Sequence, residues 1–534
     1  MEDPNHSSEK VGWNWVVPLD DALQSVADAF AGGELPADYE VIKERGRRQI
    51  WRAPKSAGGL LLKHFTVGSW ESWRSLVWPS RAGRETQMML AFQKAGIPTV
   101  EPVGFAERRK SGRVVEGWFL GRLVPNSRTL SDVLDGLDEV TGKEDVLSSA
   151  MSVVATMHQH PFLHRDLHAG NLLVEDNGHV LITDLHSAWR VPRLTRRMRV
   201  ANLGELLFSL RGVLRVELHE TVLGMYAKAR GEDLAELVRD VHLAMRRFEQ
   251  DYVRGRVARC MRNSTEFEKV KDYRGGRVWH RRSYSMETLG EDLSWHEKVA
   301  GEGGPDLLGD APHRQVVRTP DGRVIKSYRR CEFHVRLRNA LGRGRARSAW
   351  IGAREMIVRG LPTPEPLALV EFSSGVCFLV TRMAEGAALP DVLREGCDRQ
   401  MQNRLIRSTG WIVGCLSRAG LRHRDINPWN VFISREVPLE TGDLRTEPSP
   451  DLCRLTLIDL DSMHKTPPYD PAALQRMLGQ ILDREGARLT RGEHLRFCRA
   501  YESAAGCSIP EGVAKAALSR VEFRRSRRRK QQIA

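Results

Sequence analysis

The sequence lacks the features of several protein classes. Residues 1–259 contain no cysteine, and none of the eight cysteines beyond them pairs at the two-residue spacing of a zinc knuckle or redox motif. We therefore expect reduced, mostly buried thiols in a cytosolic protein. No apolar run reaches the roughly 18–20 residues that span a bilayer. The polar first ten residues do not resemble a secretory signal.

The composition is that of a globular protein with more than one core. The chain has 534 residues, 41% hydrophobic and 28% charged, which favours a folded chain of roughly two to four domains. Its net charge of +14 suits an anionic partner such as a nucleotide, a phosphorylated glycan, an anionic lipid or a nucleic acid. A basic protein without any such partner has the same charge, so charge alone does not decide.

The chain repeats itself. Three segments recur in the same order: AGIPTVEPV at 95–103 as RGLPTPEPL at 359–367, TLSDVL at 129–134 as ALPDVL at 388–393, and His-Arg-Asp at 164–166 and again at 423–425. The offsets are nearly constant, 264 residues (359 − 95) and 259 residues (423 − 164). This pattern indicates a duplicated domain of about 250 residues. We predict copies over 1–265 and 306–515, a linker over 266–305 that carries at most the first strand of copy two, and a basic tail over 516–534.

Both copies show the same coarse order of elements. We predict, for copies one and two respectively, a strand at 59–65 and 323–328, a basic helix at 80–95 and 344–359, an apolar strand at 117–124 and 376–383, and short strands at 171–174 and 180–183 and at 430–434 and 455–458. The Gly-x-Pro-Thr turn that follows the helix is a typical helix end. Strands with one helix, followed by a helix-rich part, favour a bilobal α+β fold.

The chemistry-bearing segments are His-Arg-Asp-Leu-His-Ala-Gly-Asn at 164–171 and Leu-Ile-Thr-Asp-Leu-His at 181–186. Phosphoryl transfer needs a carboxylate that accepts a proton from the attacking hydroxyl, and cations that neutralise the phosphates. Asp166 suits the first task. Asn171 and Asp184 offer oxygen ligands to Mg²⁺. A β-hairpin in the 18 residues between Asp166 and Asp184 (184 − 166) would bring the two aspartates together.

The spacing His-Arg-Asp-x-x-x-x-Asn with a later strand-borne aspartate is the protein-kinase pattern, and it occurs twice. Two alternatives are weaker. Fortuitous acidic loops would not explain the repetition. A zinc site on His164, His168 and His186 lacks the helical His-x-x-x-His spacing and a carboxylate or thiol partner at metal spacing.

A nucleotide site also needs a cation for the phosphates. Lys63 lies in a predicted strand, Gly-Leu-Leu-Leu-Lys-His-Phe, as the strand lysine of kinases does. Glu85 lies 22 residues later (85 − 63) in the predicted helix, where it would hold the lysine by an ion pair. Taken alone, Lys63 would more often be a surface lysine, so its role depends on the downstream motif.

Copy two keeps only part of this set. Lys326, Asp425, Asn430 and Asp459 match, but Ala349 stands at the position of the helix glutamate, and Glu355 follows six residues later. A polar, Pro- and acid-rich insertion at 435–453 separates the two aspartates. We therefore predict that copy two binds nucleotide and turns it over slowly, unless the helix is locally misaligned. A Gly-x-Gly-x-x-Gly loop precedes neither lysine, which argues against a standard eukaryotic-type Ser/Thr kinase.

These motifs resemble the lipopolysaccharide kinase (Kdo/WaaP) family, a protein-kinase-like group. The resemblance is carried by His-Arg-Asp-Leu-His-x-Gly-Asn, Ile-Thr-Asp-Leu-His and Ser-Arg-Ala-x-x-Glu with Gly-Ile-Pro-Thr, over about 40–210 and less closely 310–465. It implies two tandem kinase-like domains that use ATP and Mg²⁺ to phosphorylate a sugar hydroxyl of the lipopolysaccharide core at the cytoplasmic face of the inner membrane. In copy one it implies Asp166 as catalytic base, Asn171 and Asp184 as metal ligands, and Lys63 with Glu85 on the phosphates. In copy two it implies Asp425 as base, Asn430 and Asp459 as ligands, and Lys326 on the phosphates.

Other acceptors and partners stay open. The same fold would serve a protein or small-molecule kinase, as in aminoglycoside phosphotransferase-like enzymes, and a degenerate pair would serve as a nucleotide-sensing scaffold. The arginine-rich residues 520–530 suit peripheral contact with an anionic membrane, nucleic-acid binding, or simple solvation. Nucleic-acid binding has the least support, because no aromatic-interleaved RNA motif is present.

Overall fold

The computed structural model describes residues 11–18, 20–31, 39–45, 48–54, 59–136, 140–214, 218–329, 332–434, 452–481, 490–510, 512–513 and 515–516. The chain divides into two compact units, Met1–Asp251 and Tyr252–Ala534. The predicted basic tail lies outside the described residues except for its first position. No helix in the described parts of the chain is both long enough and apolar enough to cross a membrane.

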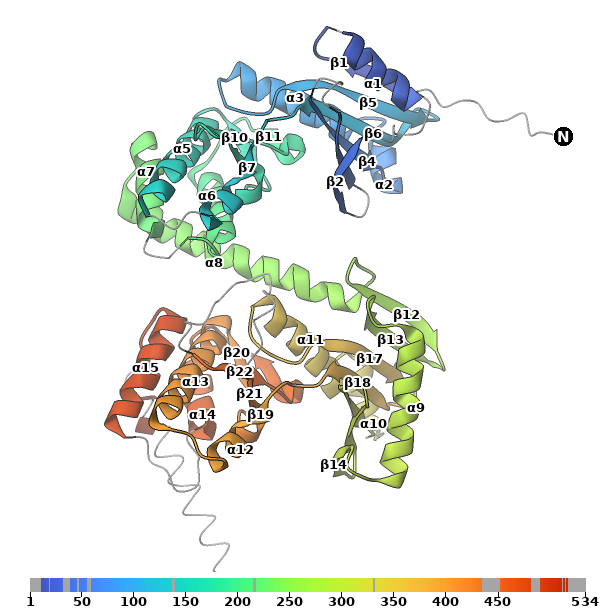
Figure 1. Cartoon of the computed structure of the whole chain (residues 1–534), viewed down its shortest axis with the longest axis vertical. Coiled ribbons are helices and arrows are strands. Elements are labelled where there is room, and N and C mark those ends of the chain that lie inside the picture. The colour runs from blue at the N-terminus through green and yellow to red at the C-terminus, as the bar shows by residue number, and fades with distance from the viewer. Residues whose placement is uncertain are drawn as a thin grey trace, which may run out of the picture. The chain divides into compact units, whose positions relative to one another are not determined.

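The N-terminal unit begins with strands and ends with helices (Figure 1). Its elements are β1 (Val11–Trp15), α1 (Asp21–Ala31), β2 (Glu40–Arg45), β3 (Arg48–Arg52), β4 (Leu60–Thr66), α2 (Ser69–Arg74), α3 (Arg81–Lys94), β5 (Pro102–Lys110), β6 (Arg113–Arg122), β7 (Arg128–Thr129), α4 (Leu130–Asp135), α5 (Val140–Gln159), β8 (Phe162–His164), η2 (Ala169–Asn171), β9 (Leu172–Val174), β10 (Val180–Ile182), η3 (Leu185–Ser187), β11 (Ala188–Arg190), α6 (Arg196–Leu210), α7 (Leu218–Arg230) and α8 (Leu234–Ala258).

A six-stranded sheet of order β1-β5-β6-β4-β3-β2 forms the first part of this unit, and all of its neighbouring strands are antiparallel. Side chains alternate between the two faces of a strand. On β4, Leu60 and Leu62 pack in one apolar cluster with Leu23 of α1. The next side chains on the opposite face are Lys63 and Phe65, and Phe65 belongs to a different cluster, with residues of α3. This alternation directs Lys63 towards α3.

Helix α3 is fixed at both ends by its sequence. The Ser80 side chain accepts a hydrogen bond from Gly83 N–H at 3.0 Å, as an N-cap does. The helix stops at Gly96, whose φ of +70° is left-handed and favours glycine. Glu85 and Met89, four residues apart, share the buried face of the helix. The glutamate is therefore held against the sheet.

The rest of the unit packs on α5, α6 and α7 around one core that includes Val154, Leu203 and Tyr226. Two small sheets lie beside these helices, one of order β10-β9-β7 and one of β11-β8. The chain between β8 and β9 carries the His-Arg-Asp motif, and the chain after β10 carries Asp184. Because β10 is antiparallel to β9 and β11 to β8, both segments come to the same end of these hairpins.

The C-terminal unit repeats this order (Figure 1). Its elements are η4 (Arg259–Met261), β12 (Phe267–Tyr273), β13 (Gly276–Arg281), α9 (Met286–Glu302), β14 (Leu307–Ala311), β15 (Arg314–Arg318), β16 (Arg323–Tyr328), α10 (Phe333–Ala340), α11 (Arg345–Val358), β17 (Pro366–Phe372), β18 (Cys377–Arg382), β19 (Ala387–Ala388), α12 (Leu389–Arg394), α13 (Arg399–Ala419), β20 (Leu421–His423), η5 (Pro428–Asn430), β21 (Val431–Ser434), β22 (Arg454–Leu457), η6 (Leu460–Ser462), β23 (Met463–Lys465), α14 (Pro471–Ile481) and α15 (Arg491–Ala505).

The prediction of a linker over 266–305 is wrong. This segment forms β12, β13 and α9, and its two strands extend a seven-stranded sheet of order β12-β13-β17-β18-β16-β15-β14. Phe267, Trp279 and Leu289 are buried in the cores of the unit. These apolar residues are separated by charged ones, so the segment has the alternation of short half-buried strands, which is easily mistaken for a polar connection. The division between the units falls inside α8 instead.

Candidate active site

A buried ion pair joins the sheet of the N-terminal unit to α3. Lys63 Nζ lies 2.5 Å from Glu85 Oε1, as the sequence predicts. The two side chains are only 4% and 0% exposed, so the pair is shielded from water. Glu85 Oε2 is buried without a hydrogen-bond partner. Lys63 is therefore the observed hydrogen-bond partner of the Glu85 carboxylate.

The His-Arg-Asp loop is held by the buried ring of His164. The N–H of Asp166 donates to His164 Nδ1 at 3.2 Å, and His164 Nε2 donates to the Thr183 carbonyl at 3.2 Å. Asn171 Nδ2 donates to the backbone carbonyl of Asp166 at 2.8 Å. These bonds fix the loop, while the Asp166 carboxylate stays 54% exposed. It is thus accessible to an incoming hydroxyl.

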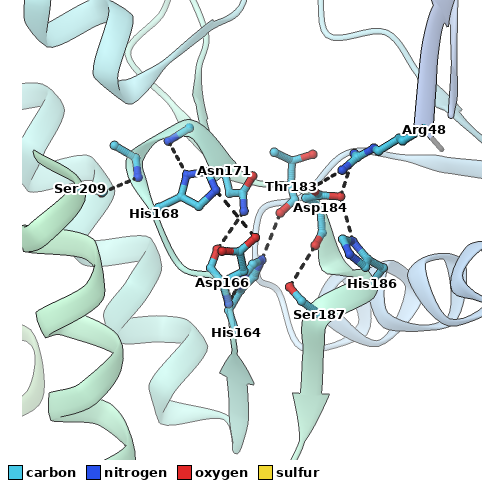
Figure 2. A network of polar contacts seen from close by, with 12 residues as sticks. Arg48, His164, Asp166, His168, Asn171, Thr183, Asp184, His186, Ser187 and Ser209 are labelled. Carbon is cyan, nitrogen blue, oxygen red and sulfur yellow. Dashed lines mark hydrogen bonds and ion pairs between the residues drawn. The ribbon is translucent and has the colours of Figure 1, made fainter. Parts of the chain in front are cut away.

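The carboxylate of Asp184 contacts the side chains of Arg48 and His186 (Figure 2). Asp184 has a left-handed backbone, with φ of +63°, and begins the short helix η3. Its Oδ1 lies 3.4 Å from Lys63 Nζ and 3.0 Å from His186 Nδ1. Arg48 binds both carboxylate oxygens, Nη1 to Oδ2 and Nη2 to Oδ1, each at 3.0 Å. Asp184 is thus surrounded by four nitrogen atoms of three side chains, from β3, β4 and η3.

The surroundings set the charge states of two of these groups. Burial alone would raise the pKa of Asp184, but Lys63, His186 and Arg48 together hold it well below its usual range. The carboxylate is therefore ionised at neutral pH. Burial lowers the pKa of His164 to about 4, against the opposing effect of its bond to Thr183. His164 is therefore neutral, which suits one ring nitrogen accepting and the other donating.

The oxygen atoms of this site suit a magnesium ion. Because Asn171 donates through Nδ2, its amide oxygen remains an acceptor, and hard cations prefer amide and carboxylate oxygens. Among the described residues, Glu85, Asp184 and His186 form a group whose ligand atoms all lie within 4.8 Å of one another. The ammonium of Lys63 binds both carboxylates of that group. His164 and His168 do not belong to it, so the geometry does not support the zinc alternative.

A turn ties α3 to the strand before Asp184. Thr99, from the repeated Gly-x-Pro-Thr turn, donates its hydroxyl to the Ile182 carbonyl at 2.7 Å, and Ile182 N–H donates to the Pro98 carbonyl at 3.0 Å. The C-terminal unit has the same pair, from Thr363 to the Leu457 carbonyl at 2.8 Å and from Leu457 N–H back to the turn at 3.1 Å. The repeated sequence thus marks a repeated structural contact.

The C-terminal unit builds its loop in the same way. Asp425 N–H donates to His423 Nδ1 at 3.2 Å, His423 Nε2 bonds the Ile458 carbonyl at 3.1 Å, and Asn430 Nδ2 donates to the Asp425 carbonyl at 2.8 Å. The residue two beyond the aspartate differs: Asn427 Nδ2 donates to Asp425 Oδ1 at 2.9 Å, whereas His168 Nε2 lies 3.8 Å from Asp166 Oδ2. The Asp425 carboxylate therefore already has a donor within its own loop.

The lysine of the C-terminal unit binds the second aspartate directly. Lys326 Nζ lies 2.8 Å from Asp459 Oδ1, and Asp459 has the same left-handed backbone as its counterpart, with φ of +57°. Arg314 Nη1 reaches Asp459 Oδ2 at 3.3 Å. Asp461 takes the place of the histidine two residues on, and it accepts from the Tyr328 hydroxyl at 2.6 Å. Burial raises the pKa of Asp461.

Helix α11 lacks the glutamate that α3 provides. Both helices have 14 residues, and Glu85 and Ala349 are each the fifth, so the structure supports the alignment and not a local misalignment. Ala349 is buried. Glu355 does not replace the missing carboxylate, because it pairs with Arg359 at 3.2 Å and Lys465 at 2.9 Å. Among the described residues, Lys326 forms an ion pair only with Asp459.

Sequence reasoning missed Arg48 and Arg314. Each begins the strand before the lysine strand, and their Cα partners, Phe65 and Tyr328, lie two residues beyond the respective lysine. Each arginine binds the aspartate that was predicted as a metal ligand. An extension of the repeat comparison to this strand would have paired the two arginines. The two strands read Arg-Gln-Ile-Trp-Arg at 48–52 and Arg-Gln-Val-Val-Arg at 314–318, so the signal is present in the sequence.

The model of the lipopolysaccharide kinase (Kdo/WaaP) family matches residues 39–226 and 321–501, more than half of the chain. The chain belongs to this family. It is therefore a kinase, with the α+β kinase-like fold that the sequence predicts in each of its two units. No curated protein matches the sequence.

Solved structures resemble this lipopolysaccharide kinase family member weakly. A structure of WaaP in complex with acyl carrier protein has 18% identity and a TM-score of 0.31, over 40% of this chain and 86% of that one. A structure of WbdD with a kinase inhibitor has 16% identity and a TM-score of 0.27, over 38% of this chain and 44% of that one. The chain thus matches less than half of the length of WbdD.

A further carboxyl group lies beside the loop of this kinase. Glu205, on α6, is close enough to Asp166 and to the backbone of Leu167 to interact with both. Burial and then the charge of Asp166 raise the pKa of Glu205 to about 8. A raised carboxyl pKa next to another carboxylate is typical of functional sites. No motif in the sequence marks this residue.

Proposed function

We propose that the N-terminal unit transfers the γ-phosphate of ATP to a sugar hydroxyl of the lipopolysaccharide core or of a related glycoconjugate, at the cytoplasmic face of the inner membrane. One observation carries this proposal. Lys63 binds both Glu85 and Asp184, and the loop beside them presents the exposed carboxylate of Asp166. A phosphotransferase needs this combination of a fixed cation and an accessible base.

Each side chain has a proposed task. Lys63, fixed by Glu85, binds phosphate oxygens of the nucleotide. Asp166 orients the acceptor hydroxyl and accepts its proton, while His164 and Asn171 keep its loop in place. Asn171 and Asp184 would hold Mg²⁺, which when bound neutralises phosphate charge.

We propose a weaker activity for the C-terminal unit. Lys326, Asn430 and Asp459 offer the same binding groups, which supports nucleotide binding. Without a glutamate at position 349, the lysine is held by Asp459 alone among the described residues, and the base Asp425 is bound by Asn427. This arrangement favours slow turnover.

The test uses the full chain, ATP labelled at the γ-phosphate and purified lipopolysaccharide core. We expect Asp166→Asn to reduce label transfer at least about 100-fold, the usual contribution of a general base. The matched variant Asp425→Asn should leave most of the transfer intact. Transfer that persists in Asp166→Asn and disappears in Asp425→Asn would show that the C-terminal unit catalyses the reaction, and would refute the proposal.

The acceptor is tested separately by mass spectrometry after incubation with an envelope extract. A phosphorylated core sugar supports the proposal. Label that appears only on a protein or a small molecule would refute the proposed acceptor and leave the kinase activity supported. ATP binding without transfer to any acceptor would favour a nucleotide-sensing scaffold instead.

A further inference from the structure

The N-terminal unit exposes several large apolar side chains within one short segment beside its active site. They lie on α2 and the turn that follows it: Trp70, Trp73, Leu76, Val77 and Trp78, here called the tryptophan patch. Trp70 is 75% exposed and Val77 83%, and the other three are at least half exposed. Large contiguous apolar surfaces are rare on proteins that have no binding partner there.

The backbone of the patch is well anchored. Ser75 is buried between the exposed residues; its hydroxyl donates to the Ser72 carbonyl at 2.6 Å and accepts from Val114 N–H of β6 at 2.8 Å. These two bonds fix α2 and its turn on the sheet edge. The exposed rings are therefore presented by an ordered base, and their exposure does not result from a loose segment.

Cations surround the patch. The guanidinium of Arg113 lies over the ring of Trp73 at 3.1 Å, and its buried Nε has no hydrogen-bond partner. Arg74 is exposed and makes no ion pair among the described residues. Arg84 also keeps a buried Nε without a partner, and burial together with Arg74 lowers its pKa. Glu71, on α2, pairs with Arg81 at 2.5 Å, whereas Arg74 and Arg113 have no carboxylate partner among the described residues. The surface thus combines aromatic rings with a net positive charge.

The patch adjoins the catalytic loop. The rings of Trp78 and Trp189 lie 6.5 Å apart, edge to face. Trp189 is on β11, which pairs with the strand that leads into the loop. The guanidinium of Arg165, the residue before the proposed base, lies 5.0 Å from the Trp189 ring. A surface bound to the patch would therefore lie close to the base.

The C-terminal unit exposes apolar residues at the same place in its fold. Between its lysine strand and α11, Leu337 is 51% exposed and Leu341 64%. In both copies this segment exposes large apolar side chains, although only the first copy carries tryptophans there. The first copy is also the one that keeps the complete Lys63–Glu85 pair.

From these observations we infer that the tryptophan patch docks on an anionic phospholipid surface. Tryptophan favours the boundary between headgroups and acyl chains, and basic residues near anionic lipids add attraction. A second copy of the chain fits less well, because a twofold contact would bring Arg74 and Arg113 against their own counterparts. The inference extends the proposed function, since a glycolipid acceptor lies in such a surface.

The test measures vesicle binding by the full chain, with phosphatidylcholine vesicles and with vesicles that also contain phosphatidylglycerol. The variant Trp70→Ser/Val77→Ser changes the two most exposed side chains, so folding should be unaffected. We expect it to weaken binding to the anionic vesicles at least tenfold. Arg74→Glu should weaken binding to anionic vesicles and leave binding to neutral vesicles unchanged. The control Leu243→Ser/Leu495→Ser removes two exposed leucines elsewhere and should bind like the wild type.

The outcomes separate this inference from the proposed function. Unchanged vesicle binding by Trp70→Ser/Val77→Ser would overturn it, as would a dimer, seen by light scattering, that only the patch variant dissociates. Transfer to a water-soluble core saccharide should be equal in wild type and patch variant, while transfer to vesicle-embedded glycolipid should fall. Patch-dependent binding without any sugar phosphorylation would leave this inference standing and refute the proposed acceptor.

Discussion

The buried Lys63–Glu85 pair makes a quantitative prediction about stability. Removing one partner of a buried ion pair costs about 3–5 kcal/mol, because the other charge is left without compensation. The structure predicts an asymmetry. In Lys63→Met, Glu85 is fully buried and loses its observed hydrogen-bond partner, so we expect the free energy of unfolding to fall by about 4 kcal/mol. In Glu85→Leu, Lys63 keeps Asp184 at 3.4 Å, so we expect about 2 kcal/mol.

The double variant Lys63→Met/Glu85→Leu completes the cycle. Apolar replacement of both partners of a buried pair is often neutral, so we expect its loss to be smaller than that of either single variant. The losses would then be non-additive by several kcal/mol, which is the signature of a direct interaction.

The assay is thermal unfolding of the full chain, combined with hydrogen exchange of β4 and α3 to locate the effect in the N-terminal unit. About 1 kcal/mol corresponds to roughly 2–4 °C in Tm for a unit of this size. Additive losses, or equal losses in the two single variants, would refute the reasoning.

Three further predictions concern single side chains. The pKa of Glu205 is raised to about 8 from 4.5, so the folded state binds its proton more tightly than the unfolded chain, and stability falls as pH rises through that interval. Glu205→Gln should therefore raise Tm by a few degrees at pH 8.5 and leave it unchanged at pH 4; equal shifts at both values would contradict this. Arg48→Gln should tighten Mn²⁺ binding without nucleotide about fivefold, the equivalent of roughly 1 kcal/mol for a half-buried ion pair, measured by electron paramagnetic resonance; weaker Mn²⁺ binding would instead make Arg48 part of the binding site. Ser80→Ala should cost about 1 kcal/mol and speed hydrogen exchange in the first turn of α3, whereas Ser285→Ala, which removes the N-cap of α9, should leave α3 unchanged.

Elements with strong local signals were predictable from the sequence. The strand predicted at 323–328 is β16, and the helix predicted at 80–95 is α3 with its capping residue at each end. The predicted ion pair between Lys63 and Glu85 also exists, because a strand followed by a helix offers few ways to place a lysine and a glutamate facing each other.

Other features depend on distant parts of the chain, and local patterns do not contain them. Arg48 meets Asp184 across 136 residues, and nothing next to either residue indicates the contact. Glu205 is perturbed only because α6 packs against the loop of Asp166. The strands β12 and β13 were missed because their place in the fold comes from distant pairing, of β13 with β17 and of β12 with β13, which their short alternating pattern does not reveal.

The left-handed backbone at Asp184 and Asp459 affects how mutants of either unit must be interpreted. Aspartate and asparagine tolerate this conformation better than alanine. Alanine at position 184 would remove a carboxylate and also impose a conformational penalty, so its inactivity would have two causes. Asparagine keeps the turn and removes only the charge, which makes Asp184→Asn the informative substitution. Both units have this left-handed conformation at the aspartate, so the same choice of substitution applies to Asp459.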